Sequence, residues 1–192
     1  NRAKGYDLFG RAVIKILNKF PTWKAIAIGD EPREKLFFSH KNLKKLGFLK
    51  HEKVLDIFTK TSIAVACSRW NEPLGRTGLE ASSRGCAVII SNRGGLPETI
   101  TNGIIIKRLN ELNVYNSIKK LIENRKYRKI LQKLSIKNFM HTHENIVDKI
   151  DLYRNIAIDS NIPKVNYYKK KEKLKILHVT NFNERHDGRL FF

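Results

Sequence analysis

Residues 63–90 read IAVACSRWNEPLGRTGLEASSRGCAVII, and this stretch decides the fold class. The apolar run at residues 63–67 predicts a buried strand, residues 75–84 predict a helix, and the apolar run at residues 86–90 predicts a second strand. A strand, a helix and a strand in this order form a parallel unit. Because ligands of such sheets bind at the carboxyl ends of the strands, the loop that follows the first strand is the expected place for a functional site.

The same alternation continues on both sides of this stretch. Apolar residues spaced by three and four positions predict a helix at residues 6–20, which Pro21 ends. Further strands are predicted at residues 24–28, 46–49 and 103–107, and further helices at residues 51–60 and 96–100. The sequence therefore predicts an α/β fold with a Rossmann-like, doubly wound parallel sheet.

The pattern becomes helical throughout after residue 110, and no strand is predicted before about residue 158. The next fifteen or so residues have the composition of a linker, with a proline and a run of lysines. Residues 174–180 alternate apolar and polar side chains, which predicts another strand. We therefore expect three parts: a main domain at residues 1–158, a lysine-rich linker at 159–173, and a truncated extra strand in the stub of a second Rossmann-like domain at 174–192.

The chain is strongly basic, with 38 Lys and Arg residues against 18 Asp and Glu residues and a formal charge of +20. This excess favours an anionic partner: nucleic acid, an anionic membrane surface or a phosphorylated substrate. The hydrophobic fraction of 41% is enough for a packed core, and no apolar run reaches the length that spans a bilayer. Cys67 and Cys86 stand among small apolar residues without a CxxC partner, which predicts buried thiols in a reduced, cytoplasmic protein.

Three residues in the segment that follows the predicted strand at 63–67 are suited to bind a ligand. Glu72 lies in the loop, and Gly75 allows a close backbone approach where the next helix begins. The N–H groups at the start of a helix suit a phosphate or diphosphate. Glu80, in the first turns of that helix, suits the hydroxyls of a ribose. From the residues alone, this arrangement predicts a nucleotide site.

The Glu72 to Glu80 spacing, with its flanks and the turn Gly94-Gly95-x-x-Glu98, resembles the motif of the retaining glycosyltransferases of family 4, the glycosyl transferases group 1. The resemblance runs from Lys4 to about Tyr153. It includes Lys4-Gly5 at the head of the first helix and Ile28-Gly29-Asp30 at a strand end. Three positions depart from the usual motif: Leu74 replaces a Phe, Ala87 stands where Pro is common, and Arg76 puts an unusual cation beside the expected phosphate site.

This resemblance implies the C-terminal, donor-binding half of a two-domain GT-B enzyme. The implied donor is a nucleotide-diphosphate sugar, transferred with retention of anomeric configuration and without a metal or other cofactor. Glu72 and Lys4 would be the catalytic residues, with Glu72 on the donor-sugar hydroxyls and Lys4 on the diphosphate. Glu80 would bind the ribose. The remaining substrate-binding positions implied by the family are Gly75, Arg76, Thr77, Gly29, Gly94 and Gly95.

The family also implies what this sequence lacks. The first strand of the domain and the acceptor-binding N-terminal domain would precede Asn1, so the fragment would bind donor without turning it over. A tandem, hexosyltransferase-type polypeptide is expected, acting in surface glycan synthesis such as that of lipopolysaccharide. The acceptor would be a polysaccharide or lipid-linked glycan. The expected location is the cytoplasm, with peripheral contact to the anionic inner face of the membrane.

Other readings of the same residues stay open. The charge alone fits a basic nucleic-acid-binding α/β module, although no recognition motif accompanies it. A sugar-nucleotide epimerase or dehydrogenase would need a GxGxxG sequence, which is missing. Glu72 and Glu80 are also compatible with a surface charge and a helix-dipole partner. His141 and His143 are two positions apart, which favours histidines at a helix end over a metal site.

Overall fold

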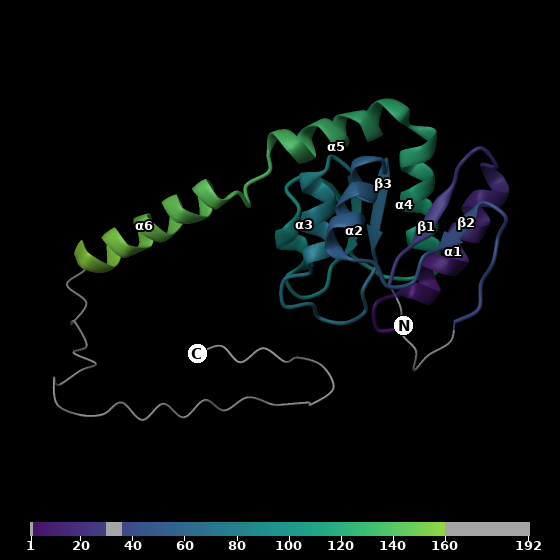
Figure 1. Cartoon of the computed structure of the whole chain (residues 1–192), viewed down its shortest axis with the longest axis horizontal. Coiled ribbons are helices and arrows are strands. Elements are labelled where there is room, and N and C mark those ends of the chain that lie inside the picture. Colours follow the sequence, from purple (N-terminus) through teal and green to yellow (C-terminus); the bar gives the residue numbers. More distant parts are fainter. Residues whose placement is uncertain (1, 30–35, 160–192) are drawn as a thin grey trace, which may run out of the picture. The chain divides into compact units, whose positions relative to one another are not determined.

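The computed structural model describes residues 2–29 and 36–159 (Figure 1). The chain divides into two compact units, residues 1–149 and residues 150–192, and every strand described belongs to the first unit. In chain order the elements are α1 (Tyr6–Lys19), β1 (Ala25–Ala27), β2 (Leu43–Lys45), α2 (His51–Thr59), β3 (Ile63–Ala66), α3 (Arg76–Ser83), β4 (Ala87–Ser91), the 3-10 helix η1 (Leu96–Thr99), β5 (Gly103–Ile106), α4 (Glu111–Glu123), α5 (Arg125–Lys137) and α6 (His143–Asp159). None of these helices is long and apolar enough to cross a membrane.

All strand pairs described are parallel, as the alternation of strands and helices predicts. Strand β4 lies between β3 and β5, with Ile63 opposite Ala87 and Val88 opposite Gly103. Strands β1 and β2 form a separate two-stranded sheet, with Ala25 opposite Leu43. The parallel α/β class is therefore confirmed, and the strands divide into two hydrogen-bonded sheets.

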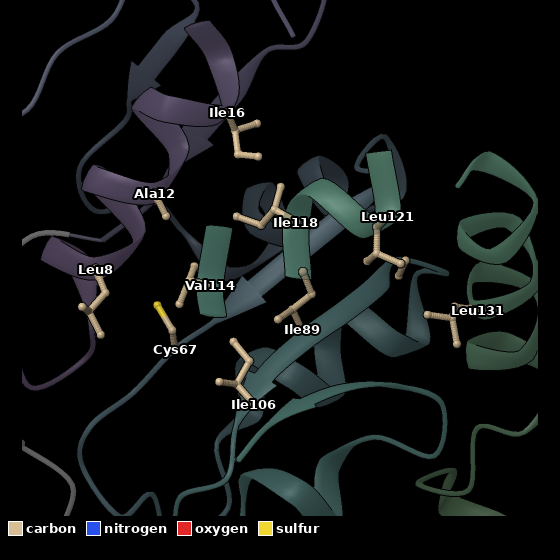
Figure 2. Close-up of a cluster of buried hydrophobic side chains, with 11 residues drawn as sticks. Leu8, Ala12, Ile16, Cys67, Ile89, Ile106, Val114, Ile118, Leu121 and Leu131 are labelled. Carbon is tan, nitrogen blue, oxygen red and sulfur yellow. The ribbon is translucent and has the colours of Figure 1, made fainter. Parts of the chain in front are cut away.

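Helices cover both faces of the three-stranded sheet. Alternate side chains of β4 point to opposite faces, and since nearly all of them are apolar, both faces must be buried. Ile89 packs into a cluster with residues of α1, α4 and α5 (Figure 2). Val88 and Ile90 point the other way and pack with Phe58 of α2 and Ala81 of α3. All five residues of β4 are buried, which explains why this strand reads as an unbroken apolar run. The doubly wound arrangement is confirmed.

One predicted strand is wrong. Residues 46–49 were expected as a strand, whereas β2 is Leu43–Lys45. Gly47 has a left-handed φ of 61°, which interrupts an extended strand, and the Phe48 side chain is 82% exposed. Strand β2 pairs only with β1 among the described residues and exposes its two lysines. It therefore lacks the apolar run by which the other strands are recognised.

A cavity of about 1740 Å³ separates β1 from β3, and both strands line it. In the described part of the chain, β1 pairs with β2 alone and β3 with β4 alone, so each has one edge without a strand partner. The walls are largely apolar and include Ile26 and Val65. Polar residues gather at the carboxyl ends of the strands, where Lys4, Glu72 and Thr77 also line the cavity.

Candidate nucleotide-sugar site

The segment before α1 lies against the loop that follows β3. The backbone N–H groups of Arg69 and Trp70 both donate to the carbonyl oxygen of Ala3, over 2.8 and 3.1 Å. Gly5 has a left-handed φ of 72°, and a Cβ at this position would collide with the carbonyl of Cys67. A glycine is therefore required for this close approach. The approach fixes Lys4 beside the loop that carries Glu72.

Lys4 and Glu72 form an ion pair. The Lys4 Nζ lies 2.6 Å from Oε1 of Glu72, although 68 residues separate the two in the sequence. The Glu72 side chain is 12% exposed, whereas that of Lys4 is 57% exposed. The structure thus brings together Lys4 and Glu72, the two residues that the motif resemblance implies to be catalytic. It places them at the carboxyl end of β3, as expected for a ligand site in a parallel sheet.

Asp7 and Arg69 join the same two segments, and sequence reasoning missed both. Arg69 donates to the two carboxylate oxygens of Asp7 over 2.6 and 2.8 Å, and Arg11 donates to Asp7 over 3.0 Å. The hydrogen bond from Arg69 and that from Arg11 lower the pKa of Asp7 to about 2, while burial opposes the shift. The i,i+4 spacing of Asp7 and Arg11 was a readable signal for an ion pair. No sequence pattern indicates the contact between Asp7 and Arg69, which lies 62 residues away.

Helix α3 begins at the point where a diphosphate is expected. Gly75 is its N-cap with a left-handed φ of 78°, and the side chain of Leu96 fills the space that a Cβ would need. The N–H groups of Arg76 and Thr77 belong to the first turn, where a helix provides no acceptor within itself. Gly75, Arg76 and Thr77 all line the cavity next to Glu72. These three therefore stand where the sequence predicts them.

Glu80 is held by the side chains of His51 and Arg76. Its Oε1 lies 3.0 Å from Nε2 of His51, the first residue of α2, and 3.2 Å from a guanidinium nitrogen of Arg76. The Glu80 side chain is 15% exposed. Arg76 thus directs its charge to Glu80, one helical turn further on. His51 was expected to open a helix, which is confirmed, but its contact with Glu80 was not foreseen.

The glycine turn after β4 supports the backbone of Glu72. The N–H of Gly95 donates to the Glu72 carbonyl oxygen over 2.7 Å. Gly94 has a φ of 53°, and a Cβ there would stand 2.7 Å from the backbone nitrogen of Glu72. Neither glycine belongs to the cavity lining, so the structure places both behind the loop. Gly29, at the end of β1, lines the cavity from the opposite side and donates its N–H to the Gly47 carbonyl.

The two thiols are buried, as the sequence predicts, and neither forms a disulfide. Burial raises the pKa of Cys67 to about 11 and that of Cys86 to about 12. His141 Nε2 lies 3.1 Å from the carbonyl oxygen of Glu98, and His143 begins α6. Within residues 2–29 and 36–159, no group of three or more His, Cys, Asp and Glu could hold a metal ion. Of the linker expected at residues 159–173, Asp159 is the last residue of α6, and the rest of the linker and the stub expected at 174–192 lie outside the described residues.

A family model described as "Glycosyl transferases group 1" matches residues 1–138. Among curated proteins, the chain is 28% identical over 199 residues to the phosphatidylinositol N-acetylglucosaminyltransferase GPI3 subunit of Saccharomyces cerevisiae. That alignment covers 96% of this chain and 41% of the yeast protein.

Solved structures share the fold. HepE from Anabaena, crystallised in complex with UDP-glucose, superposes with a TM-score of 0.64 at 18% identity, over 82% of this chain and 46% of HepE. The C-terminal domain of the group 1 glycosyl transferase LpcC from Francisella tularensis gives a TM-score of 0.62 at 24% identity, over 71% of this chain and 78% of that domain. The chain thus spans less than half the length of the yeast protein and of HepE.

Proposed function

The chain belongs to the glycosyl transferases group 1 family, and from that premise we propose that it is the donor-binding half of a GT-B glycosyltransferase. The donor is a nucleotide-diphosphate sugar. The observation that carries this proposal is the Lys4–Glu72 pair beside the first turn of α3, at the carboxyl end of β3. A cation, a carboxylate and the N–H groups of a first helical turn at one place suit a sugar diphosphate.

Lys4 and the start of α3 stabilise the leaving diphosphate. As the glycosidic bond breaks, negative charge grows on the phosphate oxygens. An ammonium 4 Å from such a charge contributes about 4 kcal/mol at an effective dielectric of about 20, before desolvation. Phosphate oxygens compete with Glu72 for Lys4, because both anions need the same ammonium. Donor binding therefore releases the Glu72 carboxylate for the hydroxyls of the donor sugar.

Glu80 binds the ribose in this proposal, with His51 and Arg76 holding the carboxylate in place. Transfer proceeds with retention and uses neither a metal nor another cofactor. Support for a UDP-sugar donor comes from HepE, which was crystallised with UDP-glucose. Support for a hexosyltransferase type comes from the yeast relative, which is a subunit of an N-acetylglucosaminyltransferase.

The acceptor is proposed to be a polysaccharide or a lipid-linked glycan in surface glycan synthesis, such as that of lipopolysaccharide. Its binding site and the remaining catalytic residues belong to an N-terminal domain, so residues 1–192 alone bind donor and do not transfer it. The basic character of the chain supports a cytoplasmic location with peripheral contact to an anionic membrane.

The cavity between β1 and β3 also supports the expected first strand of the domain. Two parallel strands with unpaired edges face one cavity with apolar walls, which is the environment of a buried central strand. We propose that such a strand completes the sheet in the whole protein. Adding it to the chain is expected to protect the backbone amides of β1 and β3 from hydrogen exchange.

The nucleotide proposal is tested by calorimetric titration of the chain with UDP, GDP and their sugars. Saturable binding of at least one ligand is expected, and Glu80→Ala should weaken it about tenfold, because hydrogen bonds to a charged group contribute roughly 1.5–3 kcal/mol. Glu52→Ala is the matched control, since Glu52 is an exposed carboxylate on α2 outside the cavity lining. Absence of saturable binding, or equal effects of the two variants, would overturn the assignment.

A further inference from the structure

Helix α5 carries an excess of positive charge. Its thirteen residues include six Lys and Arg residues and no Asp or Glu: Arg125, Lys126, Arg128, Lys129, Lys133 and Lys137. Arg128 turns inward, where it donates to the carbonyl oxygen of Leu121 over 2.6 Å and lies over the Trp23 ring at 5.0 Å. The other five are exposed.

These five charges have no carboxylate partner in the described part of the chain. Helix α1 is a useful contrast, because Arg11 and Lys15 pair with Glu111 and Lys19 pairs with Glu123. None of the ion pairs within residues 2–29 and 36–159 involves the five exposed cations of α5. No carboxylate of the described residues therefore neutralises these five charges.

Apolar side chains stand among the lysines. Ile130 is 45% exposed and Ile136 is 59% exposed. Spacings of three and four residues place both on the same side of α5 as Lys126, Lys129 and Lys133. The opposite side holds buried residues, including Leu131, which packs into the core shown in Figure 2. The outer side of α5 is thus cationic and partly apolar at once.

This surface lies away from the proposed donor site. Ser135 donates to the carbonyl oxygen of Asn102, just before β5, and Gly85, just before β4, faces the Ile136 side chain. Both neighbours are at the amino ends of strands. Lys4 and Glu72 lie at the carboxyl end of β3. The charges on α5 therefore lie too far from the donor site to serve the diphosphate, and they are open to another anionic partner.

We propose that this α5 basic face (Arg125, Lys126, Lys129, Ile130, Lys133, Ile136 and Lys137) docks on an anionic lipid surface. The lysines contact headgroup phosphates, while Ile130 and the exposed part of Ile136, whose Cδ1 end faces Gly85, reach the interface. A nucleic acid fits less well, because stacking needs exposed rings and Tyr127, the aromatic residue of α5, is half-buried beneath Lys120. The inference deepens the membrane contact proposed above and does not depend on the transfer reaction.

Vesicle co-sedimentation tests the proposal, using phosphatidylcholine vesicles with and without phosphatidylglycerol. The variant Lys126→Gln, Lys129→Gln, Lys133→Gln should lose at least about tenfold in partition to anionic vesicles. The matched control is Lys41→Gln, Lys44→Gln, Lys53→Gln, which removes three exposed lysines elsewhere and leaves the same net charge. The control variant should lose less than about threefold in partition to anionic vesicles, because the charge of the α5 basic face and not the total charge determines binding.

Two further measurements make the outcome decisive. Ile130→Ser with Ile136→Ser should weaken vesicle binding about threefold or more at unchanged charge, and duplex DNA binding should not respond to it. Equal losses in the two lysine variants, or vesicle binding without dependence on phosphatidylglycerol, would overturn the proposal. Tight DNA binding that only the α5 lysine variant abolishes would replace lipid by nucleic acid. UDP binding by the same variants reports the donor site separately.

Discussion

Arg69 donates two hydrogen bonds, of 2.6 and 2.8 Å, to the two carboxylate oxygens of Asp7, which precedes it by 62 residues. The pair joins the segment that carries Lys4 to the loop that carries Glu72. Asp7 is buried, and a paired guanidinium and carboxylate in this geometry fix direction as well as distance. The position of the Lys4–Glu72 pair therefore depends on residues that lie outside the cavity lining.

Asp7 gives the protein a specific acid sensitivity. Its pKa falls from 3.8 to about 2, chiefly because Arg69 donates hydrogen bonds to the carboxylate. A lowered carboxyl pKa stabilises the fold above the unfolded-state pKa, and this stability is lost as the pH falls through the folded-state value. At pH 7 the effect is about 2 kcal/mol.

Asp7→Asn should therefore unfold about 2 kcal/mol more easily in urea at pH 7. The difference in free energy of unfolding between Asp7→Asn and the parent chain should shrink by about half at pH 3, where Asp7 of the unfolded chain is already protonated. Urea titrations at pH 7, 4 and 3 measure this. A gap that stays constant over that range would contradict the assignment.

Arg69 and Arg11 both contact Asp7, but only Arg69 bridges the two segments of the site. Arg69→Ala is expected to weaken nucleotide-diphosphate binding about tenfold, because the Lys4 segment loses the link from Asp7 to the loop and keeps the backbone hydrogen bonds of Ala3 and the Lys4–Glu72 pair. Arg11→Ala, which leaves that attachment intact, should change binding less than about twofold. Each variant removes one hydrogen-bonded charge, a loss of about 1–3 kcal/mol of stability at most. Similar affinities for the two variants would show that Arg69 has a structural role only.

Lys4 and Glu72 should respond to substitution in opposite directions. Lys4→Ala removes the ammonium and should weaken UDP binding at least about tenfold. Glu72→Gln releases Lys4 from its ion pair, so UDP binding should stay equal or improve. In a complete enzyme the same Glu72→Gln change should lower kcat about 100 to 1000-fold, the usual cost of removing one transition-state contact. Weakened UDP binding by Glu72→Gln would speak against competition for Lys4.

Gly94 and Gly47 provide a comparison at matched backbone geometry. Their φ values are 53° and 61°, so an alanine meets a similar left-handed strain at both, of about 1–2 kcal/mol. Open space surrounds a Cβ at Gly47, whereas a Cβ at Gly94 would meet the backbone of Glu72. Gly94→Ala should therefore reduce donor affinity several-fold, whereas Gly47→Ala, at the opposite side of the cavity from Glu72, should reduce stability with a smaller effect on affinity. Calorimetric titration and urea unfolding separate the two effects.

Cys67 and Cys86 should resist thiol reagents in the folded chain at pH 8. Burial raises the pKa of both thiols, to about 11 and about 12, and the thiolate is the reactive form. Modification by 5,5′-dithiobis(2-nitrobenzoate) is expected only as urea unfolds the protein. A fast phase in the native state would contradict the burial of one of them.

Elements with strong periodicity could be predicted from the sequence. Helix α1 and the buried strand β4 have one clear apolar face or run, and both were located within one or two residues. Strand β2 could not be, since its side chains are mostly exposed and hydrogen bonds to β1 define it. The pattern of side chains carries no information on such backbone pairing.

The candidate site divides in the same way. Glu72, Gly75 and Glu80 share one short stretch after β3, so their spacing was enough to single them out. The contacts of Asp7 with Arg69 and of His51 with Glu80 connect distant segments, and no local sequence pattern predicts them. Gly94 and Gly95 were recognised by their motif. Their support of the Glu72 backbone is visible only in the three-dimensional packing.

The long separation of the paired residues also sets when this site forms during folding. Bringing Asp7 to Arg69 and Lys4 to Glu72 closes loops of more than sixty residues, which costs chain entropy before any contact compensates it. Local helices such as α1 form without that closure. Both contacts connect the amino end of α1 to the loop after β3, so a nascent chain released before Glu72 lacks the Lys4–Glu72 pair. Recovery of UDP binding during refolding is therefore expected to follow the closure of these loops.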